Sequence, residues 1–587
     1  MVGVMVGLVV WSSWSSSQRG VIQIPKPHYD YIIGTSGCVL AGKLSAVPRN
    51  SVLLVEAGDH FSWLSSIPLA TPVLQGSAQD WAFRTRTQIH SSWGLHNQSS
   101  AYPRGRGLGG SGQLNYLVHY PGCESDFVRW EEGGVTGWKY EQIRPYMMRM
   151  LGVEYNCSCL NNYRSILMAA AGHHHCQTIK VKDRPIMHVS EVDDDSELGK
   201  AFLKAGEELS SIFEAVKFST VKSTIFKGQR WSSLDGYLRP ALGRPNLHVL
   251  LNTQVNKVVI DDQRRVQGVE LRKYNDFTTR LIRSNHEVIL SAGAINTPHI
   301  LLQSGVGPRD QLEKLGIPVV SDLHVGHNLH DHLNMPLYVS IESPVSVTLD
   351  KVQQLGQLWD YMIRGKGLLS SSGIVGVGTA EPDIGIVLFG LGSADEKLLQ
   401  DIANYKQETF RALFPFSNNS SQEGFVLLAT CLQPSSRGTV TLNDTEPTSR
   451  PVIDPQYLSQ SKDIHCMIRA VQLAIQLATS TPFKQLGAKI HLPKLEECHH
   501  LEADAENTAY LECIIRTAAI TGYHPGGTCK MGSPSDHTAV TDPLLRVRGF
   551  NGLRIMDASI LPTPLSGHPN SVLIAMADRA ADLILQH

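Results

Sequence analysis

The stretch YDYIIGTSGCVLAGKL, Tyr29 to Leu44, decides the fold that this sequence predicts. Its apolar residues 31–33 indicate a short buried strand. Gly34 and Gly37 follow as a turn, and residues 38–44 are apolar enough to predict a buried helix. The stretch therefore indicates a strand, a glycine turn and a helix in close succession.

A second apolar run follows in SVLLVEAGD (Ser51 to Asp59) and predicts a strand that ends at Glu56. In dinucleotide-binding folds the glycine turn and the helix N-terminus hold a pyrophosphate, and an acid on the next strand binds the ribose hydroxyls. The usual fingerprint is G-x-G-x-x-G, whereas only G-T-S-G is present here. The sequence thus predicts a dinucleotide site whose turn departs from the usual pattern.

Length and composition indicate a large globular protein. The chain has 587 residues, of which 42% are hydrophobic and 18% are charged, and this length suits two interleaved domains. It carries 52 basic and 54 acidic residues. This balance gives no indication of a nucleic-acid partner, and none is predicted.

The cysteines and histidines do not form a metal-binding pattern. The ten cysteines are scattered along the chain, so no disulfide scaffold is predicted. Cys157 and Cys159 are close together but lack a second pair. Three consecutive histidines at 173–175, followed by Cys176, cannot all face one ion from a helix or strand. We interpret both clusters as loop and predict no metal site.

The N-terminus carries an apolar run from Met1 to Trp11 that is too short to span a bilayer. It fits the hydrophobic core of a signal peptide. We expect the secretory pathway or the extracellular space, with the mitochondrion as the alternative, and membrane association is left open. Acceptor triplets for N-glycosylation add slight support; they are at Asn97, Asn156, Asn418, Asn419 and Asn443.

A glycine-rich segment, YPRGRGLGGSGQLNYLVHYPG, runs from Tyr102 to Gly122. Its glycines allow backbone N–H groups to approach a ligand closely, and Arg104 and Arg106 favour an anion. Leucines within the segment indicate that it is packed against the protein. We expect it to contact an anionic ligand.

Five separated segments together resemble the glucose–methanol–choline (GMC) family of FAD oxidoreductases, both its choline dehydrogenases and its animal glucose-dehydrogenase-like members. They are the opening unit from Tyr29, RGRGLGGSGQLN, GAINTPHILLQSGVGP (Gly293 to Pro308), VGHNLHDHL (Val325 to Leu333) and the terminal YHPGGTCKMG, MDASILP and SGHPNS. Their order and spacing match the family from Tyr29 to the C-terminus.

The resemblance implies an α/β fold in which a Rossmann-like FAD-binding domain is interleaved with an α+β substrate-binding cap. We expect an N-terminal apolar segment at 1–27, an FAD-binding domain with inserted cap elements at 28–330, and the cap at 331–515. Residues 516–587 are expected to complete the FAD domain and the active site.

Against this family the opening unit lacks three residues, V-G-A, before Gly34. Gly34 and Gly37 match the second and third family glycines, and the first is absent. Three extended residues span about 10 Å, so we expect weak retention of FAD. Two interpretations follow: an FAD-dependent alcohol oxidoreductase, or a non-catalytic or FAD-deficient family member.

The resemblance also implies cofactor contacts. Leu114 replaces a histidine to which some relatives attach FAD covalently, so FAD is expected to bind non-covalently. Val255 is expected near the adenine, and Asn570 is expected to cap the last helix. The residues expected to bind FAD are Gly34, Gly37, Glu56, Arg104, Gly109, Gly110, Ser111, Asn115, Val255, Asp557, Ala558 and Asn570.

Oxidation of an alcohol by a flavin needs a base for the hydroxyl proton, and histidine titrates near the operating pH. The resemblance places His524 as the catalytic base and His568 as a second catalytic residue that orients the substrate hydroxyl. The expected partners are a small-molecule alcohol and an electron acceptor, either oxygen or quinone-like. The substrate itself is left open.

Overall fold

The structure is a computed structural model that describes residues 20–34, 37–151, 153–156, 177–180, 185–191, 196–212, 215–273, 278–381, 383–393 and 395–586. The N-terminal apolar segment, the Cys157–Cys159 pair, the histidines at 173–175 and turn residues Thr35 and Ser36 lie outside the described residues.

The first of two large sheets is built on the opening stretch. In spatial order its strands are β13 (Leu247–Leu250), β2 (Val52–Val55), β1 (His28–Ile33), β16 (Thr279–Leu290), β15 (Val266–Lys273) and β14 (Thr253–Ile260), and β25 (Leu553–Ile555) also pairs with β16. Neighbouring strands from β13 through β2 and β1 to β16 run parallel, as do β16 and β25, whereas β15 runs antiparallel to both β16 and β14. All four residues of β2 are buried, as expected for a parallel strand covered on both faces.

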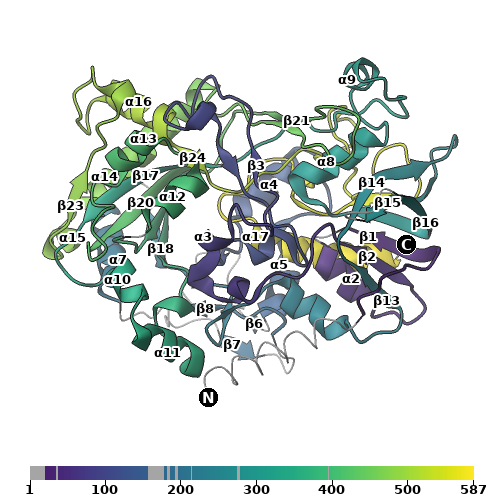
Figure 1. The fold of residues 1–587 in the computed structure, drawn as a ribbon, viewed down its shortest axis with the longest axis horizontal. Helices are drawn as coiled ribbons and strands as arrows, with labels where there is room; N and C mark the ends of the chain where they lie inside the picture. Colours follow the sequence, from purple (N-terminus) through teal and green to yellow (C-terminus); the bar gives the residue numbers. More distant parts are fainter. Residues whose placement is uncertain are drawn as a thin grey trace.

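Helices from both ends of the chain cover this sheet (Figure 1). The short helix α2 (Cys38–Leu44) packs against the last helix, α17 (Asn570–Gln586), which also packs against α5 (Tyr140–Leu151). The fully buried carboxylate of Asp578 on α17 pairs with Lys43 of α2 at 3.0 Å and with Arg149 of α5 at 2.5 Å. The C-terminal helix is therefore fixed beside the opening unit by packing and by charge.

The second sheet is antiparallel throughout. Its strand order is β23 (Lys489–His491), β17 (Leu333–Ser340), β20 (Gly424–Cys431), β19 (Ile384–Phe389), β18 (Ile374–Ala380) and β9 (Lys217–Thr220), and β24 (Ile520–Thr521) also pairs with β17. Helices α14 (Ser461–Ala478) and α7 (Glu197–Leu209) pack on it.

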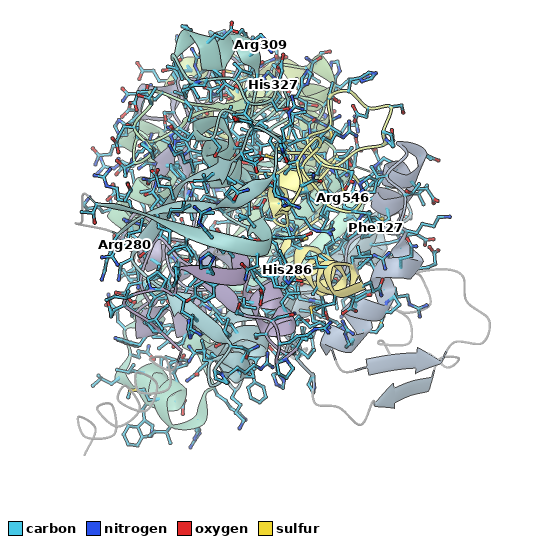
Figure 2. All side chains as sticks on the ribbon, turned by 90° about the vertical axis from the view of Figure 1, so that its right-hand side faces the viewer. Phe127, Arg280, His286, Arg309, His327 and Arg546 are labelled. Atoms are coloured by element: carbon cyan, nitrogen blue, oxygen red, sulfur yellow. A yellow bond between two sulfur atoms is a disulfide. The ribbon has the colours of Figure 1, made fainter. Side chains whose placement is uncertain are left out.

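This arrangement confirms the expected α/β fold with two interleaved units, which lie side by side in Figure 1. The second sheet takes β9 from the segment 28–330, in which inserted cap elements were expected, and β24 from the segment after residue 515. Both strands are short, and β9 alternates between exposed and half-buried residues, so their sequence signal is weak. Figure 2 shows the outer side of the first sheet, with Arg280 and His286 on β16.

Among the described residues, two disulfides lie in the second unit and join Cys431 to Cys466 and Cys498 to Cys513. The first ties β20 to α14, the helix that covers it. The scattered spacing of the cysteines gave no sign of these pairs, because the partners are brought together only by the packing of the sheet. No helix within the described part of the chain is both long and apolar enough to cross a membrane.

Candidate active site

A cavity of about 1890 Å³ is lined by residues from both sheets and from the glycine-rich loop. Sequence-predicted residues from every part of the chain meet on its wall. They are Gly34, Arg104, Gly109, Gly110, Ser111, Asn115, Val255, His524, Asp557, Ala558, His568 and Asn570. Leu114 also lines the cavity.

Two predicted cofactor residues, Gly37 and Glu56, are not on the wall. A Cβ atom on Gly37 would come within 2.1 Å of the Ile33 side chain, so this glycine allows the helix to pack tightly against the strand. Glu56 is 1% exposed, and its carboxylate accepts a hydrogen bond from the N–H of Gly58 at 2.7 Å. Its neighbours Val55 and Ala57 do line the cavity. The structure therefore places Gly37 and Glu56 behind the lining residues, and their expected contacts with FAD stay predictions.

The glycine-rich loop forms a cradle whose shape excludes side chains. A Cβ atom on Gly105 would lie 2.4 Å from the carbonyl oxygen of Gly110, and Gly109 has a φ of 101°. At the end of β1, a Cβ atom on Gly34 would lie 3.0 Å from the backbone nitrogen of Ser291. Backbone without side chains is thus brought to the cavity surface at both glycine segments, as needed for close contact with a pyrophosphate.

Polar groups around Ser291 suit an anionic cofactor. The Ser291 hydroxyl is fully buried at the cavity wall and has no hydrogen-bond partner among the described residues. It precedes helix α8 (Gly293–Gln303), whose first residues also line the cavity, so the positive end of the helix dipole faces the same space. Asp557 accepts hydrogen bonds from the Gly293 N–H at 2.9 Å and the Thr297 hydroxyl at 2.5 Å. The Asp557 carboxylate thus already uses one donor of the first turn of α8, and the unpartnered Ser291 hydroxyl is the polar group that remains for an elongated dinucleotide such as FAD.

A buried arginine that the sequence analysis missed supports the glycine-rich loop. Arg230 is 4% exposed and donates hydrogen bonds to the Ser65 carbonyl at 2.7 Å, the Asn115 side-chain oxygen at 2.7 Å and the Thr71 hydroxyl at 2.7 Å. Burial lowers the pKa of its guanidinium to about 9, so it remains charged at neutral pH. Asn115 is therefore held from behind, with its side-chain oxygen directed towards Arg230.

The loop that carries His524 is fixed by one buried carboxylate. Asp331 accepts hydrogen bonds from the backbone N–H groups of His524 at 2.7 Å and His332 at 2.9 Å. Its other oxygen accepts from the hydroxyls of Tyr457 at 2.5 Å and Thr521 at 2.6 Å. Strand β24, which ends at Thr521, pairs with β17, which begins immediately after His332. The sheet thus brings two loops, far apart in sequence, to one point on the cavity wall.

The hydrogen bonds of the two histidines determine where their protons lie. Nε2 of His332 lies 2.9 Å from the carbonyl oxygen of Leu432, and a carbonyl can only accept, so Nε2 carries the proton. Neutral His332 therefore accepts at Nδ1, which lies 2.8 Å from Nδ1 of His524. His524 must then carry its proton on Nδ1. Its Nε2 keeps a free lone pair and makes no hydrogen bond to the described residues.

A third imidazole completes the group. The rings of His524 and His568 lie 4.9 Å apart, nearly perpendicular to each other, and both line the cavity. Desolvation lowers the pKa of His568 to about 4, and it lowers the pKa of His524 well below 6.5, with smaller contributions from nearby His568 and His332. Desolvation also lowers the pKa of His332. All three rings are thus neutral at pH 7, and His524 can accept a proton.

Comparison with known proteins agrees with this arrangement. Residues 29–334 and 434–577 match the two sequence models of the GMC oxidoreductase family. The chain is 36% identical to the Drosophila melanogaster protein called neither inactivation nor afterpotential protein G, over 95% of this chain and 90% of that protein. It is 33% identical to human mitochondrial choline dehydrogenase, with the same coverage. The chain belongs to the GMC oxidoreductase family.

GMC oxidoreductases bind FAD, and the fold of this member agrees with theirs. The crystal structure of pyridoxine 4-oxidase from Mesorbium loti superimposes with a TM-score of 0.75 at 24% identity, over 95% of this chain and 99% of that one. The resemblance inferred from five motifs is therefore confirmed, and so is the fold.

Three residues that organise the site of this GMC oxidoreductase were not predicted from its sequence: Arg230, Asp331 and His332. Asp331 and His332 are adjacent in the motif VGHNLHDHL, which supports the family resemblance but does not by itself indicate a role for either residue. The signal available was a histidine next to an acid just before a buried strand. Arg230 lies on a two-residue strand and had no sequence signal.

Proposed function

We propose that the protein is an FAD-dependent oxidoreductase that oxidises the CH–OH group of a small-molecule alcohol. The observation that carries this proposal is the chain of hydrogen bonds from the Leu432 carbonyl through His332 to His524. It leaves the Nε2 lone pair of neutral His524 available at the wall of a large cavity. Such a nitrogen is suited to accept the hydroxyl proton of an alcohol. The relatives named glucose dehydrogenase and alcohol dehydrogenase support the same class of reaction.

In this mechanism Nε2 of His524 accepts the proton from the substrate hydroxyl, and the carbon–oxygen bond becomes a carbonyl as hydride leaves the same carbon. FAD, when bound non-covalently, supplies the acceptor for that hydride. His568 lies against His524 and orients the hydroxyl by a hydrogen bond. The positive charge that His524 gains is stabilised by His332, which keeps accepting the Nδ1 proton.

FAD would be held by the backbone of the glycine cradle, by the Ser291 hydroxyl and by the N-terminus of α8. Oxygen or a quinone-like acceptor would remove the electrons afterwards. The alternative of a non-catalytic or FAD-deficient member rests on the shortened turn at Gly34. The cavity and the three neutral histidines favour catalysis.

The test is an assay of a panel of primary and secondary alcohols with an artificial electron acceptor, using protein whose flavin absorbance has been measured. For the alcohol that reacts, His524→Ala should lower turnover by about 10²–10⁴-fold and leave flavin absorbance unchanged. His568→Asn, which retains a hydrogen-bonding group, should have a smaller effect. Unchanged turnover in His524→Ala would refute the mechanism, and flavin-loaded protein without activity on any alcohol would favour the alternative.

We also propose that the chain enters the secretory pathway. Two disulfides suit an oxidising compartment, and the glycosylation triplets within the described residues are all exposed, at Asn97, Asn418, Asn419 and Asn443. Protein made in eukaryotic cells should lose mass on endoglycosidase treatment. Recovery from the cytosol, without glycan and with all cysteines reduced, would contradict this.

A further inference from the structure

Helix α11 (Leu355–Arg364) exposes an apolar face that no described residue covers. The exposed fractions are 83% for Leu355 and 56% for Trp359, and the other large apolar residues of this face are also exposed. The face consists of Leu355, Leu358, Trp359, Met362 and Ile363. Their spacing of three and four places them along one side of the helix.

The opposite side of α11 is polar, and it is this side that contacts the protein. The Gln357 side chain accepts a hydrogen bond from the backbone N–H of Leu368 at 3.0 Å, and the Tyr361 hydroxyl reaches the Ser66 carbonyl at 3.5 Å. Both residues are half-buried, and no residue of the helix is fully buried. The helix is therefore turned with its apolar face outwards, the reverse of a surface helix in a soluble domain.

Cationic side chains gather at the C-terminal end of this helix. Arg364 and Lys366 are exposed, and the turn between β11 (Ile225–Phe226) and β12 (Gln229–Arg230) brings exposed Lys227 to the same place, because Gly228 packs against Gly365. The acidic residue of the helix, Asp360, lies 3.4 Å from Arg364 and is paired with it. An apolar face that includes tryptophan, bordered by cations, is typical of helices that lie in the interface of anionic membranes.

We propose that α11 docks on an anionic lipid surface and inserts its apolar face between the headgroups. A second copy of the chain fits the helix less well. A helix of this length is about 15 Å long and about 10 Å wide, so its face is far smaller than the roughly 800 Å² per partner that a stable dimer buries. A lipid surface needs no matching shape and attracts the cations at the end of the helix. In Figure 1, α11 lies at the lower edge of the molecule, away from both sheets, where a planar surface can reach it.

Docking at this place would bring the lipid surface close to the cavity. The preceding helix, α10 (Leu349–Val352), contributes Leu349 and Val352 to the cavity wall. On its other side, α11 packs on η8 (Leu368–Ser370), which contacts the η3 turn (Pro68–Ala70). Leu69 of this turn also lines the cavity. An apolar alcohol dissolved in the membrane could enter from there. The docking itself does not depend on the proposed reaction.

The experiment is sedimentation of the full-length protein with vesicles of phosphatidylcholine containing phosphatidylserine, and with vesicles of phosphatidylcholine alone. The variant Trp359→Ser/Ile363→Ser should bind the anionic vesicles at least about tenfold more weakly than the unmodified protein. The matched control is Ile89→Ser, which removes a 78% exposed isoleucine outside this helix and should leave binding unchanged. Equal thermal unfolding of the variants would show that they are folded.

Absence of vesicle binding by the unmodified protein would overturn the proposal. Vesicle binding that survives the double substitution would also overturn it. The same holds if that binding is lost only when residues 1–19 are removed. A dimer in analytical ultracentrifugation that dissociates in the double variant, without vesicle binding by either protein, would identify the face as a contact between copies and would equally overturn it.

Discussion

His332 and His524 meet nitrogen to nitrogen, with 2.8 Å between their Nδ1 atoms, and the other nitrogen of His332 lies 2.9 Å from the Leu432 carbonyl. This chain of hydrogen bonds fixes the tautomer of His524, because Nδ1 of His332 accepts the proton that Nδ1 of His524 carries. In catalytic groups where a carboxylate holds a histidine, the partner acts by fixing the tautomer and stabilising the imidazolium. His332 has the same relation to His524, with a neutral ring in place of the carboxylate, and so is a positioning residue.

Replacement of His332 by phenylalanine keeps an aromatic ring at this position but removes the acceptor for the Nδ1 proton of His524. We expect turnover to fall on the order of 10²-fold while flavin absorbance is retained, because His524 can then place its proton on either nitrogen. The apparent pKa of kcat/KM should shift as well, which loss of stability alone would not cause. His96→Phe, at an exposed position, is the control. An unchanged pH profile and turnover would show that His332 has no role in positioning.

The dependence of activity and stability on pH follows from the lowered pKa values. His524 accepts protons only when neutral, and its pKa lies well below 6.5, so kcat/KM should be constant around neutral pH and fall only in acid. The folded protein should also lose stability as the pH falls below about 6.5. In the unfolded chain His568 then binds a proton, whereas in the folded protein it is buried, has a pKa of about 4 and stays neutral. Rate profiles and thermal unfolding between pH 4 and 9 measure both. Half-maximal activity at or above pH 7 would contradict the assignment.

Arg230 connects the glycine-rich loop to the segment that contains Ser65 and Thr71. Replacement by methionine leaves buried oxygens without donors, and we expect it to destabilise the protein by about 3 kcal/mol and to lower both the unfolding temperature and the flavin content. Arg239→Met is the control, because Arg239 is exposed and pairs with Asp235 at the surface, where an ion pair contributes about 0–1 kcal/mol. Similar melting temperatures for the two variants would show that the hydrogen bonds of Arg230 do not stabilise the loop.

The sequence predicted the overall fold because its signals are local. The strand at 31–33, the glycines that follow and the buried helix at 38–44 can each be identified within a short window, and motif order then assigns the family. Asp331 and His332 could not be assigned in this way. Their roles depend on the pairing of β17 with β24, which brings position 332 beside position 524. The outward-facing apolar side of α11 was missed for a related reason, since helical spacing alone does not reveal which side faces the protein.

The shortened turn after β1 gives the most direct test of cofactor binding. The Gly34 N–H donates to the Ile289 carbonyl at 3.2 Å, and the Gly37 N–H donates to the Gly34 carbonyl at 3.0 Å, so the strand passes into α2 with little backbone between them. Ile32 and Ile33 line the cavity beside Gly34, where a longer turn would offer backbone N–H groups.

Insertion of Val-Gly-Ala between Ile33 and Gly34 should therefore raise the flavin content of the purified protein, measured as flavin absorbance per chain. An insertion of three alanines at the same place is the matched control and should raise it less, since the first glycine serves the tight turn. Equal flavin content in the unmodified protein and both variants would show that the short turn binds FAD as well as a full one.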